Sequence, residues 1–171
     1  MKIWISGAFS VGKSTLIQEI KKYTDIEVFD ETAREILEEI GKRPEDMTKE
    51  ELNKLQELIV ERQTNKEQIH SFITDTTLIE VLAYSKDLEV YNKIEKQIKE
   101  HYKKQIYDVL FYIPIEFEIE DDWLRHTNKE FQSIIDKRIR DNILKYRPAK
   151  EIIKITGTIE ERIKEIKKRL T

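Results

Sequence analysis

The residues best suited to chemistry stand at positions 7–15, which read Gly-Ala-Phe-Ser-Val-Gly-Lys-Ser-Thr. Two glycines bracket four residues and a Lys-Ser pair follows, which is the spacing of a phosphate-binding loop. Glycines let the backbone curl with its N–H groups pointing inward around a polyphosphate. Lys13 can then reach the β- and γ-phosphates, and the Ser14 hydroxyl can ligate Mg²⁺. We therefore predict a nucleotide site at Gly7, Ala8, Phe9, Ser10, Val11, Gly12, Lys13, Ser14 and Thr15.

Acidic residues at two places in the chain could complete a phosphate-transfer site. Asp30 and Glu31 follow an apolar stretch at 26–29, and Asp75 ends another at 71–75. A carboxylate at either place could orient an acceptor hydroxyl and take its proton. Asp75 also suits Mg²⁺, with the Ser14 hydroxyl as a second ligand. Asp30 and Asp75 could instead cap the helices that follow them.

Two arginines could neutralise phosphate charge. Arg34 stands in the first turn of a predicted helix, where a cation opposes the helix dipole, so an anionic neighbour is indicated. That neighbour is either substrate phosphate or a local carboxylate such as Asp30 or Glu38. Arg125 lies in a polar stretch at about 116–130, which we predict to be a lid over the transferring phosphate. An ordinary solvated loop is the alternative, and Arg138 or Arg140 on the next helix could serve in its place.

The elements around these residues alternate between strands and helices. Strands are predicted at 2–6, 26–29, 71–75, 107–113 and 151–155, with amphipathic helices between them and after the last strand. Thr48 and Glu51 form a capping box for a helix that could extend to His70, and Gly41 is expected to end the helix before it. This alternation predicts an α/β fold with a five-stranded parallel sheet covered by helices on both faces. Ligands of such sheets bind at the carboxyl ends of the strands, which adds Gly157 to the nucleotide site.

Composition limits the class of protein. The chain has 171 residues, which suits a single domain spanning 1–171. Lysine and arginine number 31 against 34 acidic residues, so the net charge of −3 argues against a surface that coats nucleic acid. The absence of cysteine is compatible with a reducing cytoplasm, where we expect the protein to be. No apolar run approaches ~20 residues, and no signal peptide or membrane span is expected.

Two large groups of phosphate-loop proteins are excluded by missing motifs. A GTPase would need Asp-x-x-Gly and Asn-Lys-x-Asp, and neither occurs. A motor or remodelling ATPase would need an apolar strand that ends in Asp-Glu, whereas the third strand ends in Thr74-Asp75-Thr76. A small phosphotransferase remains, because such enzymes combine the glycine loop with acidic residues after the second and third strands and an arginine-bearing lid.

The order of these motifs resembles the ribosylnicotinamide kinase-like P-loop family, which consists of small AAA-type kinase domains. Glu31-Thr32-Ala33-Arg34-Glu35 matches the family's Glu-x-Ala-Arg-Glu, and Asp75-Thr76-Thr77 resembles its Asp-Thr-Asp. Weaker matches follow at Ala83-Tyr84, Tyr107-Asp108, Asp121-Asp122-Trp123-Leu124-Arg125, Phe131-Gln132 and the closing segment 156–162. The chain departs from the pattern at Thr77, which replaces an aspartate, and at Trp123, which replaces a lid glycine.

The resemblance implies an enzyme that uses ATP, or another NTP, and Mg²⁺ to phosphorylate a ribosyl hydroxyl of a small nucleoside-like acceptor. By that match Glu31 and Arg34 sit at the acceptor site, and Asp75 lies near the metal or the acceptor. Asp30 is a further candidate for the acceptor site, because it precedes Glu31 at the end of the second strand. The catalytic set is then Lys13, Glu31, Asp75 and Arg125.

Three other functions stay open. A kinase of RNA or DNA ends would use the same groups with a basic groove, for which Lys137, Arg138, Arg140, Lys145 and Arg147 are the available cations. A nucleoside monophosphate kinase would use them on a phosphate acceptor. A regulatory NTPase would bind nucleotide and act through partners. The oligomeric state is not indicated by the sequence.

Overall fold

The computed structural model describes residues 1–104, 106–116, 118 and 128–170. Most of the predicted lid at 116–130, with Arg125, therefore lies outside the described residues. Within them, five strands form one parallel sheet in the order β2-β3-β1-β4-β5. The strands are β1 (Lys2–Ser6), β2 (Glu27–Phe29), β3 (Phe72–Thr74), β4 (Tyr107–Tyr112) and β5 (Ala149–Lys154). The predicted fold class is confirmed.

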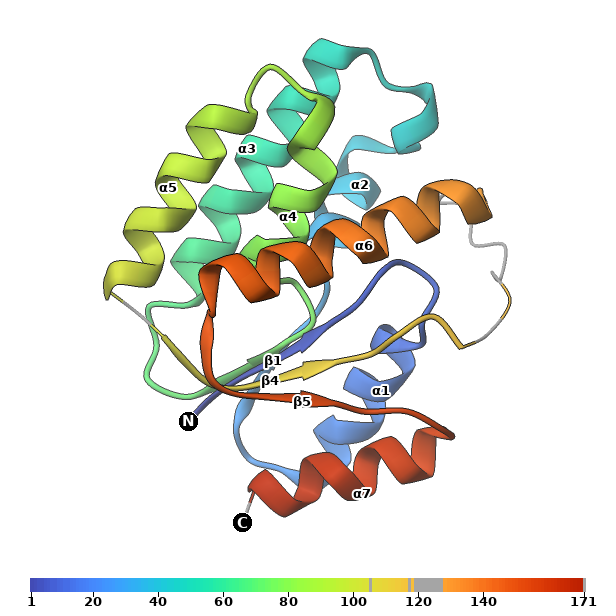
Figure 1. Cartoon of the computed structure of the whole chain (residues 1–171), viewed down its shortest axis with the longest axis vertical. Helices are drawn as coiled ribbons and strands as arrows, with labels where there is room; N and C mark the ends of the chain where they lie inside the picture. The colour runs from blue at the N-terminus through green and yellow to red at the C-terminus, as the bar shows by residue number, and fades with distance from the viewer. Residues whose placement is uncertain (105, 117, 119–127, 171) are drawn as a thin grey trace.

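Helices cover both faces of this sheet (Figure 1). On one face α1 (Lys13–Ile20) packs against α7 (Ile159–Leu170). The other face carries α3 (Lys49–Lys66), α4 (Leu78–Tyr84), α5 (Tyr91–Lys104) and α6 (Lys129–Tyr146), with α2 (Thr32–Ile40) against α3. None of the described helices is long and apolar enough to cross a bilayer.

The core lies along the central strands. Ile3, Trp4 and Ile5 of β1 and Phe72 of β3 are fully buried, because helices cover the sheet on both sides and neither face of these strands meets water. Strand β5 is different, since it forms an edge of the sheet and most of its side chains are exposed or half-buried. Burial is therefore deeper along the central strands than along β5.

Local sequence signals place two helix boundaries correctly. The Thr48–Glu51 capping box is present in both directions, and Gly41 ends α2 in the left-handed conformation at φ 67°. The predicted extension of α3 to His70 is wrong, because the helix ends at Lys66. Its cap residue Glu67 is fully buried, and Oε2 of Glu67 lies 2.8 Å from Nε2 of His101 on α5.

Candidate functional site

The glycine loop joins β1 to α1 in a conformation that few side chains would permit. Gly12 has φ 88° and Ser10 has φ 58°, both in the left-handed region. A Cβ atom on Gly7 would lie only 2.5 Å from the carbonyl oxygen of Ile113, just beyond β4. Gly7 is thus required by the close approach of the loop to the end of β4.

Lys13 begins α1 and folds back onto the loop. Its Nζ donates to the carbonyl oxygens of Gly7 at 2.6 Å and Ala8 at 2.9 Å. The residue is buried, and Nζ also lies 3.8 Å from Oε2 of Glu80. The ammonium group is therefore positioned at the glycine loop, as the predicted phosphate contact requires.

Glu80 is a site residue that the sequence analysis missed. It lies in the first turn of α4 and accepts a hydrogen bond from the Gly7 backbone N–H at 3.0 Å. Burial raises the pKa of Glu80 to about 7, although the charge of Lys13 and the Gly7 N–H both act to lower it. One signal was available, because Glu80 is an acid inside the run Leu78-Ile79-Glu80-Val81-Leu82 and its apolar neighbours are all buried.

The two predicted acidic positions meet at a cavity of about 250 Å³. Ser14, Glu31 and Asp75 all line it, so the carboxyl ends of β1, β2 and β3 contribute to one space. The described residues contain no group of three side chains of the types that usually hold a metal. In phosphate-transfer sites, however, Mg²⁺ typically takes one or two carboxylates together with waters and substrate phosphates. The hydroxyl of Ser14 and the carboxylate of Asp75 are hard oxygen ligands that fit this pattern.

Asp30 and Glu31 both line this cavity, but their side chains make different contacts. Asp30 accepts hydrogen bonds from Gln18 at 2.9 Å and Lys21 at 2.7 Å, which tie it to the α1 segment. Glu31 occupies the N-cap position of α2 without a side-chain cap bond. The expectation that Asp30 caps this helix is therefore wrong, and so is a cap by Asp75, because Thr77 caps α4 instead. Arg34 lines the same cavity as Glu31 and lies 3.9 Å from Glu38, the local partner named as its alternative.

A second cavity, of about 210 Å³, opens on the other side of Glu31. Its polar lining includes Lys13, Glu31 and Glu80, and its aromatic lining is Phe9, Tyr84 and Phe131. The ring of Phe131 lies 6.1 Å from that of Phe9 and 6.2 Å from that of Tyr84, measured between centroids. Lys13 and Glu31 thus stand beside an aromatic chamber formed by the glycine loop and helices α2, α3, α4 and α6.

Residues far along the chain hold the glycine loop in place. The fully buried guanidinium of Arg162 donates to the Val11 carbonyl at 2.7 Å and to Glu116 at 2.8 Å. Glu116 also accepts from the Gly157 backbone N–H at 3.0 Å, which links the predicted Gly157 to the loop through two side chains. The side-chain amide of Gln132 donates to the Phe9 carbonyl at 2.6 Å. The sequence analysis gave neither Arg162 nor Gln132 a role, although both stand in segments that match the family pattern.

Other predicted cations are engaged elsewhere. Arg138 donates to Asp87 at 2.7 Å and to the Ala83 carbonyl, and Arg140 donates to Asp136 at 3.0 Å. Neither lines the two cavities that contain Glu31. Arg125 lies outside the described residues.

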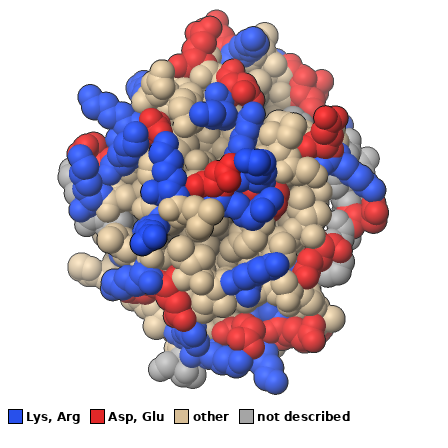
Figure 2. Space-filling view, in the orientation of Figure 1, with Lys and Arg blue, Asp and Glu red and all other residues tan. Residues whose placement is uncertain are grey.

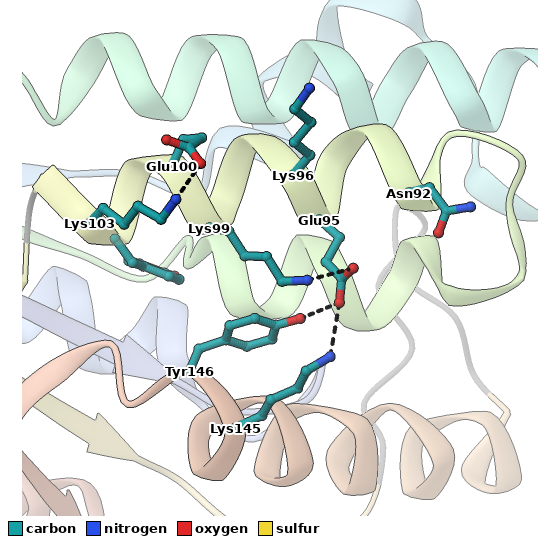
Figure 3. A pocket seen from close by; sticks show the side chains of 9 residues that line it. Asn92, Glu95, Lys96, Lys99, Glu100, Lys103, Lys145 and Tyr146 are labelled. Carbon is teal, nitrogen blue, oxygen red and sulfur yellow. Dashed lines mark hydrogen bonds and ion pairs between the residues drawn. The ribbon is translucent and has the colours of Figure 1, made fainter.

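A larger cleft, of about 480 Å³, lies between α5 and the end of α6, away from the glycine loop (Figure 3). Tyr146, Lys145 and Lys99 surround the carboxylate of Glu95 there, and their hydrogen bonds lower the pKa of Glu95 to about 2. These bonds join the two helices, so we interpret the group as an ion-paired helix contact.

The strand order, the glycine loop and the carboxylates at the strand ends define a P-loop domain with the fold of small nucleoside kinases. A family model described as an AAA domain matches residues 2–162, and the chain belongs to that family.

Solved structures agree on the fold. The chain aligns with the NadR protein in complex with NR at a TM-score of 0.76 and 17% identity, covering 98% of this chain and 50% of that one. The alignment with NadR in complex with NAD and AMP-PNP has a TM-score of 0.75 and 15% identity, and it covers 99% of this chain and 49% of that one. The chain therefore spans about half the length of these relatives. The alignment with deoxyadenosine kinase from M. mycoides, with products dCMP and dCDP bound, has a TM-score of 0.70 and 19% identity. It covers 99% of this chain and 98% of that one. No curated protein matches the chain.

Proposed function

We propose that the chain transfers the γ-phosphate of ATP to a hydroxyl of a small nucleoside-like acceptor in the presence of Mg²⁺. The observation that carries this proposal is the chamber of about 210 Å³ in which Lys13 and Glu31 meet an aromatic lining. A flat ring suits the aromatic walls, and a hydroxyl beside Glu31 would be next to the phosphate that Lys13 contacts.

Each residue then has a distinct task. The loop N–H groups and Lys13 bind the donor phosphates, and Ser14 and Asp75 would hold Mg²⁺, which draws charge from the phosphate oxygens. Glu31 lines both cavities and orients the acceptor hydroxyl while taking its proton. Arg125 is assigned to the transferring phosphate by its place in the family pattern, and Arg125→Ala should lower kcat by about 10³-fold.

A polymeric acceptor is less well supported. Four of the cations available for a basic groove are paired with carboxylates: Lys137 with Asp141, Arg138 with Asp87, Arg140 with Asp136, and Lys145 with Glu95. On the face drawn in Figure 2, basic and acidic side chains are interspersed. A surface of mixed sign attracts nucleic-acid phosphates weakly.

A transfer screen with γ-labelled ATP tests the proposal. Nucleosides, nucleoside monophosphates and hydroxyl-ended oligonucleotides are offered as acceptors to the wild-type chain, to Lys13→Ala and to Lys54→Ala. We expect a labelled nucleoside product that Lys13→Ala abolishes and that Lys54→Ala, a change at an exposed residue of α3, leaves intact. Labelled oligonucleotide, with binding that weakens about one log unit per log of salt for each phosphate contacted, would overturn the proposal.

A further inference from the structure

Helix α3 carries two buried glutamines, seven residues apart, with opposite surroundings. Gln63 is fully buried and accepts from Thr32 at 2.7 Å, and its amide nitrogen lies 2.9 Å from Glu67 and 3.3 Å from Thr74. Gln56 is 7% exposed and lines the aromatic chamber beside the glycine loop. Within the described part of the chain, neither amide atom of Gln56 has a hydrogen-bond partner.

The amide of Gln56 is not sealed inside the core: unlike the hydroxyls of Ser6 and Ser10, it keeps access to the space of the chamber. There it can bond to water in the free chain and to a ligand that displaces this water. The neighbours of Gln56 in the chamber lining are the apolar Leu52, Leu55 and Ile59 of the same helix. The amide at Gln56 is thus the polar group that this apolar stretch of the lining offers to an occupant of the chamber.

The shape and lining of the chamber limit what that partner can be. Phe9, Tyr84 and Phe131 offer aromatic surface for a flat ring, and Lys13 and Glu31 line the same space. A glutamine amide carries a donor and an acceptor side by side, which pair with a ring edge that presents the complementary two groups.

We propose that Gln56 binds the ring of the acceptor through two hydrogen bonds, and that the acceptor is therefore a nucleoside whose ring carries an adjacent donor and acceptor. This inference rests on the proposed function and names its substrate class. The amino group and ring nitrogen of adenine or cytosine provide such an edge, and so does the carboxamide of a pyridine riboside. A non-aromatic acceptor, or a ring without that edge, leaves the amide unpaired and binds less tightly.

The test compares ligands that differ only in the edge. Binding is measured by calorimetry without ATP, so the result does not depend on catalysis. The pairs are adenosine with purine riboside, cytidine with pyrimidin-2-one riboside, and nicotinamide riboside with nicotinic acid riboside. For the pair that the wild-type chain accepts, loss of the donor–acceptor edge should weaken binding by about 10- to 100-fold. In Gln56→Leu the ratio should fall to near one.

A second readout separates ligand recognition from a structural role. Gln56→Leu should unfold at a temperature no lower than that of the wild-type chain in the absence of ligand, because Gln56 makes no hydrogen bond within the described part of the chain. Gln63→Leu is the matched control and should unfold at a lower temperature, because it removes the hydrogen bonds that Gln63 makes with Glu67 and Thr32. Gln56→Glu keeps the shape of the side chain and should also lose the preference between paired ligands.

Two results would overturn the inference. The first is a Gln56→Leu variant that retains the wild-type preference, and the second is a wild-type chain that binds none of the six ligands. The proposed function is judged separately, by Lys13-dependent transfer of label in the acceptor screen. Transfer with an unchanged preference in Gln56→Leu would refute only the role of Gln56.

Discussion

The carboxylate of Glu80 accepts a hydrogen bond from the backbone N–H of Gly7 at 3.0 Å, although the two residues are 73 positions apart in the chain. Lys13 lies 3.8 Å from the same carboxylate. The free chain thus pairs an N–H and the lysine of its phosphate loop with a buried acid. Two features of the site, its pH response and the stability of its lysine variants, follow from this arrangement.

The stability of the free chain should decrease as the pH rises from about 4.5 to about 7. The pKa of Glu80 is raised from 4.5 to about 7, so in this window the folded chain binds a proton that the unfolded chain has released. The protonated Glu80 carboxyl contributes its full stabilisation below pH 4.5, and this contribution is lost as the pH rises through the pKa of the folded chain, about 7. A shift of this size corresponds to on the order of 3 kcal/mol in the free energy of unfolding. Urea titrations at a series of pH values measure the slope of the free energy of unfolding against pH.

Glu80→Gln isolates this contribution. Its side-chain oxygen can still accept from Gly7, but it does not titrate, so the Glu80 part of the slope should disappear. Glu89→Gln, a change at an exposed residue, serves as the control and should leave the slope as in the wild-type chain. An unchanged slope in Glu80→Gln would show that the carboxyl is not the group responsible.

Lys13→Ala should lose stability above pH 7, and Glu80→Gln should restore it. Without the ammonium group, the buried carboxylate lacks its nearby cation, at a cost of roughly 1–3 kcal/mol. In the double variant the acid is neutral and that cost is removed. Transfer activity should stay absent in both, because the donor phosphates have lost their lysine. If the two substitutions simply add in thermal unfolding at pH 8, the two side chains are not coupled.

Glu31→Gln should lower kcat by about 10²–10⁴-fold with ATP affinity unchanged, since a positioned proton acceptor contributes about that much. Asp30→Asn is the adjacent control and should stay close to wild type, because Asp30 is bonded to Gln18 and Lys21 and, unlike Glu31, does not line the aromatic chamber. Asp75→Asn should raise the Mg²⁺ concentration needed for half-maximal rate. Initial rates over a range of ATP and Mg²⁺ distinguish the three variants, and the reverse ranking of Glu31→Gln and Asp30→Asn would move the base to Asp30.

The fold could be predicted from the sequence because its signals are local. Apolar runs, the capping box at Thr48 and the glycine at 41 each act within a few residues of their position. The end of α3 was missed because it is not local, since Glu67 depends on His101 of another helix, 34 residues away.

The same distinction applies to the site. The glycine loop, Glu31 and Asp75 could be predicted as site residues because motif spacing and strand ends mark them, and Ser14, Glu31 and Asp75 line one cavity. Glu80 contacts Gly7 from 73 positions away, and Arg162 contacts Val11 from 151 positions away. The sequence around Glu80 or Arg162 therefore does not indicate which loop residue it contacts. Gln56 is recognised only when the chamber and its missing hydrogen bonds are known.

Arg162→Met should weaken ATP binding by about tenfold and lower the unfolding temperature. The buried guanidinium donates to Val11 in the phosphate loop and to Glu116, and its loss leaves the Val11 carbonyl without this donor, at a cost of roughly 1–3 kcal/mol. Arg162→Lys should be impaired as well, because a single ammonium lacks the fork that reaches both acceptors.

Arg169→Met is the control for this prediction. It removes an arginine of the same helix whose partner, Glu151, lies on the exposed surface, so its effect should be small. Calorimetric titration with a non-hydrolysable ATP analogue and thermal unfolding provide both measurements. Equal behaviour of Arg162→Met and Arg169→Met would show that the arginine does not support the loop.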